Sequence, residues 1–397
     1  MAGPLEGVRV LDLSQWQQGP YATVMMSDMG ADVIKVERPE YGDAGRSALG
    51  GPDPQGVAPD FFAHNRGKRG ITVNLSNPRG REIVLKLAET MDVVVTNFRL
   101  GVMEDWGLGY DVFRERNPRI IYAQASGSGP KGPNRQRPMF DIVAQAMGGL
   151  MSVTGEEGRM PLPVGAFVGD QVGAIVLALA ITSALYNRER TGVGQSVDVS
   201  LLGTQVALQS FEITHHLLTG EVPKPGGRGH PHTAWLWYTF PAADGYFTMA
   251  GVRDDKWRDF CAIVGDEALA DDPRFNTYDA RAENRDALVE RLDAAFKQHS
   301  VARWEEALAT IDAACGPVRS YDEVVADPQV IENGYIGEME HPHLGHIRFV
   351  STPIEFSETP VKSQGPQPEL GQHTEEVLLE IGYDWDEIVK LREEGAI

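Results

Sequence analysis

Residues 8–37 read VRVLDLSQWQQGPYATVMMSDMGADVIKVE, and this stretch decides the fold. Residues 8–13 are a short run of apolar and β-branched residues, which predicts a strand. After a polar loop, residues 21–29 have helical character and end at Gly30, a residue suited to a helix C-terminus. Residues 31–37 form a second apolar run and predict another strand. A strand, a helix and a strand in this order indicate a parallel sheet covered by helices.

The same alternation continues downstream. We expect extended segments at 71–75, 92–96 and 119–124, and a helix at 78–90 that starts with a proline. The pattern changes near residue 192, where a long helical stretch over 198–220 leads into a loop rich in Gly, Pro and His. Short strands and amphipathic helices follow, then a strand at 347–350 and a final helix near 374–395.

These patterns predict an α/β protein with a Rossmann-like parallel-sheet large domain and a smaller α+β domain. A length of 397 residues also favours two domains over one. The expected divisions are residues 1–200 for the large domain, 201–232 for a linker, 233–340 for the small domain, and 341–397 for a C-terminal segment that returns to the large domain.

The composition excludes several classes of partner. A formal net charge of −21 repels nucleic acid and anionic membrane surfaces, so an anionic ligand needs a local basic pocket. The two cysteines, Cys261 and Cys315, build neither a disulfide framework nor a zinc site. The first residues lack the features of a signal peptide, and the apolar run at 172–186 is shorter than the ~20 residues of a membrane span. We therefore expect a cytoplasmic protein.

Basic residues are grouped in the N-terminal part of the chain. Arg38 follows the second strand, Arg46 lies in the next loop, and the segment NRGKRG at 65–70 supplies three more. Guanidinium groups suit phosphates, although solvated loops are the commoner use of such residues. Glu37 lies where a dinucleotide fold places its ribose carboxylate, but the glycine fingerprint of such folds is missing, which disfavours NAD.

Asp170 opens the most apolar helix of the chain, and two interpretations compete for it. A carboxylate at a helix N-terminus can simply cap the helix. A partly desolvated carboxylate can also act as a nucleophile. The residues alone favour the cap. His230 and His232 lie in a loop without the spacing of a metal site, so we expect no metal there.

Ten segments, spread in order from residue 4 to the C-terminal tail, resemble one family. The chain is similar throughout to class III CoA-transferases of the CaiB/BaiF type, which include formyl-CoA, carnitine and bile-acid CoA-transferases and are related to α-methylacyl-CoA racemase. The segments are PLEGVRVLDLSQWQQGPYAT, MGADVIKVERPEYGD, NRGKRGITVNLSNPRGRE, DVVVTNFRLGVMEDWGLGY, NPRIIYAQASGSGPKGP, FDIVAQAMGGLMSVTG, VGDQVGAIVLALAITSALYNRERTGVGQSVDVSLL, FPAADGYF, CGPVRSYDEVVADPQV and EHPHLGHIRFVSTPI.

The resemblance implies transfer of coenzyme A from an acyl-CoA donor to an organic carboxylate, without a metal or redox cofactor. Asp170 matches the family's nucleophile, which forms an aspartyl-CoA thioester, and Gln17 matches a second catalytic position. The family also implies an interlocked homodimer, with a heteromer of related chains as the alternative. The positions implied to contact coenzyme A are Gln17, Gln18, Arg38, Val73, Asn74, Leu75, Asn97, Phe98, Arg99, Phe140 and Asp141.

The sequence departs from the family at three positions. Ser76 and Asp105 replace basic residues, and Arg99 or Lys68 are the candidates to compensate. Phe140 stands where the racemases need a histidine, which favours acyl exchange over the alternative of a racemase or isomerase. A non-catalytic CoA-binding subunit is a further alternative, against which the presence of Asp170 argues.

The loop PGGRGHPH at 225–232 differs from the usual acceptor loop of formyl-CoA transferase, which argues against formate and oxalate. Arg228 and the neighbouring histidines are candidates to meet a second carboxylate. Such a contact would suit succinyl-CoA as the donor.

Overall fold

The computed structural model describes residues 3–47, 56–233 and 236–397, which divide into two compact units. The first unit comprises Met1–Gly148, Gly165–Leu208 and Pro328–Ile397, and the second comprises Gly149–Val164 and Gln209–Asp327. The sequence places residues 149–164 in the large domain, but in the structure they belong to the second unit. The sequence ends the small domain at residue 340, whereas the first unit already includes the chain from Pro328 onward.

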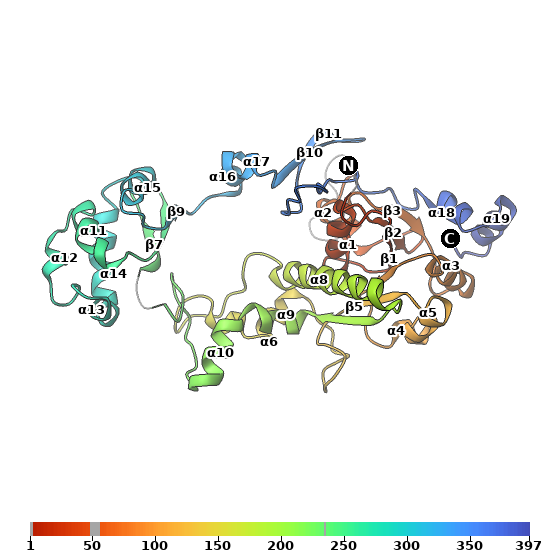
Figure 1. Cartoon of the computed structure of the whole chain (residues 1–397), viewed down its shortest axis with the longest axis horizontal. Coiled ribbons are helices and arrows are strands. Elements are labelled where there is room, and N and C mark those ends of the chain that lie inside the picture. The colour runs from red at the N-terminus through yellow and green to blue at the C-terminus, as the bar shows by residue number, and fades with distance from the viewer. Residues whose placement is uncertain (1–2, 48–55, 234–235) are drawn as a thin grey trace. The chain divides into compact units, whose positions relative to one another are not determined.

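The first unit is built on a parallel sheet (Figure 1). Every strand pair in this sheet is parallel. The spatial order is that of a doubly wound dinucleotide-binding sheet, so the predicted α/β class is confirmed. In spatial order the strands are β3 (Arg69–Thr72), β2 (Asp32–Glu37), β1 (Arg9–Asp12), β4 (Val93–Thr96), β5 (Ile121–Ser126) and β6 (Ser196–Ser200).

Two predicted helices differ from the structure. Residues 198–200, expected at the start of a helix, belong to the edge strand β6, because SVDVS at 196–200 alternates polar and apolar residues with the period of a strand. The final helix near 374–395 is two helices, α18 (Thr374–Glu380) and α19 (Trp385–Glu393). Between them Gly382 has a φ of +83°, a backbone conformation that ends a helix.

Helices cover both faces of the sheet, which buries its apolar strands on two sides. On one face α1 (Gln18–Asp28) and α8 (Val168–Thr191) pack together against the sheet (Figure 1). On the other face the core includes residues of α3 (Pro78–Ala88), α5 (Tyr110–Arg116), α18 and α19. The other helices and strands of this unit are α2 (Pro59–Asn65), α4 (Val102–Asp105), α6 (Asp141–Met147), α9 (Leu201–Leu208), α17 (Pro328–Glu332), β10 (Ile336–His341) and β11 (Gly345–Val350).

Helix α8 confirms the helix predicted at 172–186 and extends beyond it at both ends. It is long and apolar enough to cross a membrane by those two measures. However, Ala174, Leu177 and Ile181 are buried in the core against the sheet, as in the central helix of a globular domain.

The position of the site follows from the strand order. Strands β1 and β4 are neighbours, and the chain leaves them toward opposite sides of the sheet. In such sheets ligands bind in the crevice beyond the carboxyl ends of these two strands. Residues 13–17 follow β1 and residues 97–100 follow β4, so these two loops form the walls of the crevice.

The second unit has its own core and a small antiparallel sheet of β7 (Trp237–Pro241), β8 (Tyr246–Ala250) and β9 (Cys315–Pro317). Phe240, Phe247 and Phe296 are buried in its core. The helices of this unit are α7 (Leu150–Val153), α10 (Ser210–Thr219), α11 (Trp257–Ile263), α12 (Ala268–Asp271), α13 (Tyr278–Glu283), α14 (Arg285–Phe296), α15 (Val301–Ala309) and α16 (Tyr321–Ala326).

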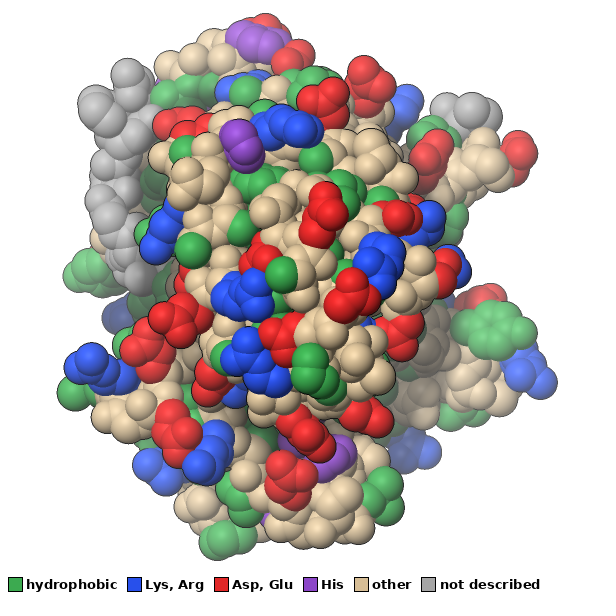
Figure 2. All heavy atoms as spheres, turned by 90° about the vertical axis from the view of Figure 1, so that its left-hand side faces the viewer, with side chains coloured by type: hydrophobic (Ala, Val, Ile, Leu, Met, Phe, Trp, Pro, Cys, Tyr) green, Lys and Arg blue, Asp and Glu red, His purple; other side chains and the backbone are tan. Residues whose placement is uncertain are grey.

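Figure 2 shows acidic and basic side chains mixed over one face of the molecule.

Candidate active site

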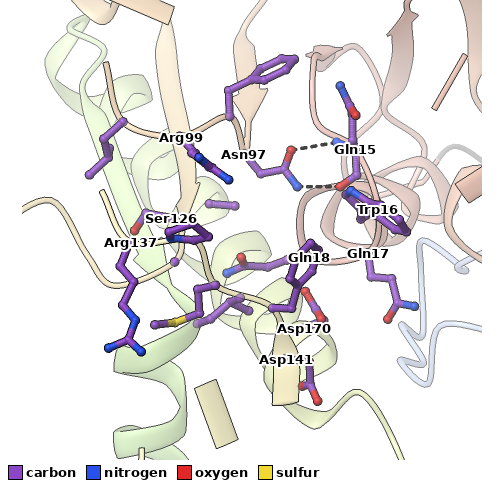
Figure 3. Close-up of a pocket in the computed structure, with 18 of the residues that line it drawn as sticks. Gln15, Trp16, Gln17, Gln18, Asn97, Arg99, Ser126, Arg137, Asp141 and Asp170 are labelled. Carbon is purple, nitrogen blue, oxygen red and sulfur yellow. Dashed lines mark hydrogen bonds between the residues drawn. The ribbon is translucent and has the colours of Figure 1, made fainter. Parts of the chain in front are cut away.

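A cavity of about 510 Å³ lies at the carboxyl end of the parallel sheet in the first unit (Figure 3). Its walls come from the loops after β1, β4 and β5, and from the first turns of α6 and α8. It brings together eight of the positions predicted from the sequence. These are Gln17, Gln18, Asn97, Phe98, Arg99, Phe140, Asp141 and Asp170.

A second cavity of about 250 Å³ is lined by the other predicted positions, Arg38, Val73, Asn74 and Leu75. Ser76 also lines it, whereas Asp105 is not among the residues lining either cavity. Gln15 and Phe98 line both cavities, so the two are neighbours along the same crevice. An elongated ligand that occupies both would have one end at Arg38 and the other at Asp170.

Asp170 lies in the first turn of α8 but is not its N-cap, which is Phe167. The capping interpretation is therefore wrong. A helix N-terminus favours the ionised form of a carboxyl group. Here the opposite effects win: burial, and then the nearby carboxylates of Asp141 and Asp60, raise the pKa of Asp170 to about 7. The backbone N–H of Gln18 donates to the carboxylate and partly opposes this shift.

Asp141 anchors the start of α8. Its Oδ1 accepts the backbone N–H of Gly169 at 2.6 Å, and its Oδ2 accepts the side-chain amide of Gln145 at 2.5 Å. A Cβ atom at position 169 would lie 2.7 Å from Gln205 Nε2 and 2.9 Å from Asp141 Oδ1, so a larger residue there would displace these side chains. Asp141 thus holds in place the helix turn that carries Asp170.

The end of the loop after β1 and the start of α1 carry Gln17 and Gln18, which line the larger cavity together with Asp170. Gln18 donates its side-chain amide to the carbonyl of Val199 at 3.1 Å, and its backbone N–H donates to the carboxylate of Asp170. Gln17 donates its side-chain amide to Asp60 Oδ1 at 2.9 Å. The turn between loop and helix is tight: a Cβ atom on Gly19 would lie 2.3 Å from the Cβ of Ser14.

Asn97 joins the two walls of the crevice. Its Oδ1 accepts the backbone N–H of Gln15 at 2.8 Å, and its Nδ2 donates to the Gln15 carbonyl at 2.6 Å (Figure 3). Trp16, the next residue, has a φ of +65°, which is strained for any residue with a Cβ. Its ring meets Phe140 edge to face at 6.1 Å. Sequence reasoning missed Gln15 as a site residue, because its contact with Asn97 joins two distant segments.

The basic residues of 46–69 do not form the phosphate site considered from the sequence. Each is paired with a carboxylate inside the first unit, and the charge of Lys68 is fully buried with its partner. Lys68 therefore cannot compensate for Ser76 and Asp105, and Glu37 is engaged by Arg46 rather than free for a ribose. The pairs are Arg46–Glu37 at 2.7 Å, Arg66–Asp28, Lys68–Asp12 at 2.8 Å and Arg69–Asp32 at 2.7 Å.

Buried charged residues next to β1 hold the loop that follows this strand in place. Burial alone would raise the pKa of Asp12. The positive charges of Lys68 and Lys35 instead hold this pKa well below its ordinary value. Lys35 also donates to the carbonyl of Ser14 and to Asp43 Oδ2 at 2.7 Å. Asp43 Oδ1 in turn accepts the backbone N–H of Trp16 at 3.1 Å. These contacts fix the loop that carries Gln17 and Gln18.

Other arginines remain available for an anion. Arg99, Arg135 and Arg137 line the larger cavity, and Arg38 lines the smaller one. Within the part of the chain that the structure describes, none of these four forms an ion pair with a carboxylate. In a protein of net charge −21 this is the basic surface that an anionic ligand requires.

The loop at 225–232 is expected from the sequence to offer Arg228 and its neighbouring histidines to a second carboxylate of the substrate, but Arg228 and His230 already have partners in the second unit. Arg228 forms two hydrogen bonds with Asp293, at 3.1 and 2.9 Å, so its charge is already neutralised. His230 Nε2 lies 2.8 Å from Glu212 Oε1. Among the residues that the structure describes, His, Cys, Asp and Glu side chains form no group of three or more suited to a metal ion.

Comparison with known proteins gives a consistent result. The model of CoA-transferase family III matches residues 5–374. The mouse succinyl-CoA:glutarate CoA-transferase is 36% identical over 99% of this chain and 90% of its own length. The succinate–glutarate CoA-transferase of Agrobacterium fabrum is also 36% identical, over 95% of this chain and 96% of its own.

A solved structure agrees with these relatives. A CaiB/BaiF family protein from Brucella suis is 35% identical, with a TM-score of 0.86 that covers 96% of this chain and 100% of that one. The family predicted from the sequence motifs is thereby confirmed. The chain belongs to CoA-transferase family III and is an enzyme of this class.

Proposed function

We propose that this enzyme transfers coenzyme A between carboxylic acids through covalent catalysis at Asp170. The single observation that carries the proposal is the placement of the Asp170 carboxylate. It lines the larger cavity, and its pKa is raised to about 7. A carboxylate of this kind is ionised in a large fraction of molecules near neutral pH, and it is more basic than an ordinary aspartate. Both properties suit a nucleophile.

The reaction divides a difficult exchange into four attacks. Asp170 attacks the donor thioester and forms a mixed anhydride with release of the CoA thiolate. The thiolate attacks the Asp170 carbonyl carbon, which gives the aspartyl-CoA thioester and the free donor acid. The acceptor carboxylate then attacks this thioester and again releases the thiolate. The thiolate attacks the acyl carbon of the acceptor, which forms the new acyl-CoA and restores the Asp170 carboxylate.

The site supplies what these steps need. Each attack creates an oxyanion, and the backbone N–H of Gln18 already points at the Asp170 carboxylate. Anchoring the nucleotide end of coenzyme A in the smaller cavity, beside Arg38, keeps the released thiolate near the anhydride. In this proposal coenzyme A extends along both cavities, and no step requires a metal or redox cofactor.

We propose a succinyl-CoA donor and a short dicarboxylic acid as the acceptor. Two relatives are named for succinate or succinyl-CoA and glutarate. In this chain, arginines without carboxylate partners in the described residues line the cavity that contains Asp170, and Arg99 is one of them. A second, distant carboxylate of the substrate needs such a cation, because a guanidinium pairs with a carboxylate through two hydrogen bonds.

The test combines a substrate panel with detection of the intermediate. Purified enzyme is incubated with succinyl-CoA and a set of mono- and dicarboxylic acids, and new acyl-CoA esters are separated by chromatography. Asp170→Asn and Arg99→Ala are compared with the wild type. We expect loss of exchange in the first variant and a raised KM for dicarboxylates, relative to monocarboxylates, in the second.

Trapping the enzyme with hydroxylamine in the presence of acyl-CoA should modify Asp170, as seen by mass spectrometry. Normal turnover by Asp170→Asn would refute the covalent route. Exchange of the α-proton of an acyl-CoA with deuterium, without any acceptor acid, would instead support a racemase.

We also propose a homodimer as the working state. The support is an apolar strip on the outer side of α8, where Ile175, Leu179 and Tyr186 are 52%, 64% and 68% exposed. Large apolar side chains exposed together are typical of interfaces. Light scattering coupled to gel filtration tests this, since a mass close to that of one chain at micromolar concentration would contradict it.

A further inference from the structure

We propose that Asp60 and His64 are positioning residues for the nucleophile. Together with Gln17 and Gln171 they close a ring of hydrogen-bonded side chains beside Asp170. The ring joins three elements, the loop before α1, the helix α2 and the first turn of α8. The inference rests on the proposed role of Asp170, and the experiment below separates the two.

The ring links Gln171 to Asp60 along two paths, one through Gln17 and one through His64. Gln17 Nε2 donates to Asp60 Oδ1 at 2.9 Å, and Gln171 Nε2 lies 3.5 Å from Gln17 Oε1. The same Gln171 amide lies 3.2 Å from His64 Nε2. His64 Nδ1 is 2.8 Å from the Asp60 carbonyl oxygen and 3.3 Å from Asp60 Oδ1.

One tautomer of the imidazole matches the donors and acceptors of this ring. In the tautomer that matches a donating Gln171 amide, His64 Nε2 is the acceptor. In this tautomer His64 Nδ1 donates to the backbone carbonyl oxygen of Asp60, the nearer of its two oxygen neighbours.

Asp60 and His64, the two titratable side chains of the ring, are both buried. The side chains of Asp60 and His64 are each 8% exposed, and Asp60 Oδ2 has no hydrogen-bond partner among the described residues. Burying a carboxylate that is incompletely paired is costly. The ring contains no lysine or arginine to pair with the Asp60 carboxylate.

The consequence falls on Asp170, the residue next to Gln171 in the chain. The groups that act on its carboxylate are Asp141 from α6, Asp60 from α2 and the backbone N–H of Gln18 at the start of α1. Tyr21 of α1 packs against His64, with its ring edge to face with the imidazole at 5.6 Å. The charge of Asp60 opposes ionisation of Asp170, and its hydrogen bond holds Gln17 in place.

The ring therefore has two separable effects, one on charge and one on geometry. Asp60→Asn keeps an oxygen that accepts from Gln17 but removes the charge. Asp60→Ala removes both. His64→Gln keeps an acceptor for Gln171, whereas His64→Ala does not. The matched control is Asp111→Asn, which changes an exposed aspartate in the first turn of α5, away from both cavities.

The experiment measures kcat and kcat/KM for CoA transfer from pH 5 to pH 9, with thermal stability recorded for each variant. Asp60→Asn should shift the acid limb of both profiles to lower pH by about half to one pH unit, because a like charge near Asp170 is removed. Asp60→Ala should in addition lower kcat about 10- to 100-fold with little change in KM, because the geometry is lost. His64→Gln should recover most of the activity that His64→Ala loses.

A purely structural role predicts a different pattern. If the Asp60 variants lose stability but keep the wild-type pH profile, or if they keep both profile and kcat, the proposal is overturned. Asp170→Asn is run in the same assay. An active Asp170→Asn enzyme would refute the proposed function itself, whereas an inactive one beside unchanged Asp60 variants would refute this inference alone.

Discussion

The Oδ1 atom of Asp141 accepts the backbone N–H of Gly169 at 2.6 Å, and this bond ties the start of one helix to the start of another directly before the proposed nucleophile. Free N–H groups at a helix N-terminus need an acceptor, and no side chain caps α8 from within. Asp141 fills this need from α6. The same carboxylate also raises the pKa of Asp170.

Replacing Asp141 should therefore reduce catalysis through geometry. We expect Asp141→Ala to lower kcat about 10- to 100-fold, because displacement of a reacting group by about 1 Å has effects of this size. Asp141→Asn retains an acceptor for Gly169 and should lose much less activity, with its acid limb moved to lower pH. Steady-state kinetics of the two variants measure this. Equal losses in both would show that charge, rather than the bond to Gly169, is what matters.

Ionisation of Asp170 should destabilise the folded protein. Its pKa rises from 3.8 to about 7 on folding, so the folded state resists losing the proton. Stability attributable to this group therefore falls as the pH rises from about 4 to about 7, and levels off above that. Asp170→Asn removes the effect and should be more stable than the wild type at pH 8, by on the order of 2–4 kcal/mol.

Urea unfolding at pH 4.5 and pH 8 checks this prediction. The gap in free energy of unfolding between Asp170→Asn and the wild type should be larger at pH 8. A gap that does not depend on pH would contradict the raised pKa.

Lys68 should be a stability residue rather than a ligand for phosphate. Lys68→Met leaves the fully buried Asp12 without its partner, which should cost about 3–5 kcal/mol. The double variant with Asp12→Asn removes both charges and should regain part of this loss. Chemical denaturation measures the stabilities, with Lys131→Met, a change at an exposed position, as the control. Weaker CoA binding at unchanged stability would instead support a direct contact.

Asn97→Ala should loosen the crevice. It removes two hydrogen bonds to the backbone of Gln15, at 2.8 and 2.6 Å, which join the loops after β1 and β4. At about 1 kcal/mol for each bond, the loss is about 2 kcal/mol, which sets an upper limit of roughly 30-fold on the fall in kcat/KM that we expect. Asn117→Ala removes two side-chain bonds to the Ala88 and Met91 carbonyls and serves as the control. If both variants lose stability but neither loses kcat/KM, the link between the loops is not catalytic.

The strands of the parallel sheet could be predicted largely from local pattern. The segments at 8–13, 31–37 and 92–96 are short apolar runs. Such a run is the sequence pattern of a strand that is buried on both faces of a sheet. The edge strand β6 was missed because its short SVDVS segment runs directly into a helix. The break at Gly382 was missed because the residues on both sides favour helix.

The charged residues show where local pattern is insufficient. Arg66 and Lys68 stand two positions apart in a glycine-rich loop, which from the sequence suits a phosphate. Their partners, Asp28 and Asp12, come from α1 and β1, and the pairs form inside the unit. Whether an arginine or lysine is free for a ligand depends on which carboxylates the fold brings to it.

By itself, the sequence determined the α/β class, the family and the position of Asp170 at the start of the long apolar helix α8. Each of these depends on residues that are near one another in the chain. The tertiary structure alone decided the chemical state of that carboxylate. Asp141 and Asp60 reach Asp170 from separate helices, and burial removes the water that would screen them. The electrostatic environment of a group is a sum over neighbours in space, and only folding specifies those neighbours.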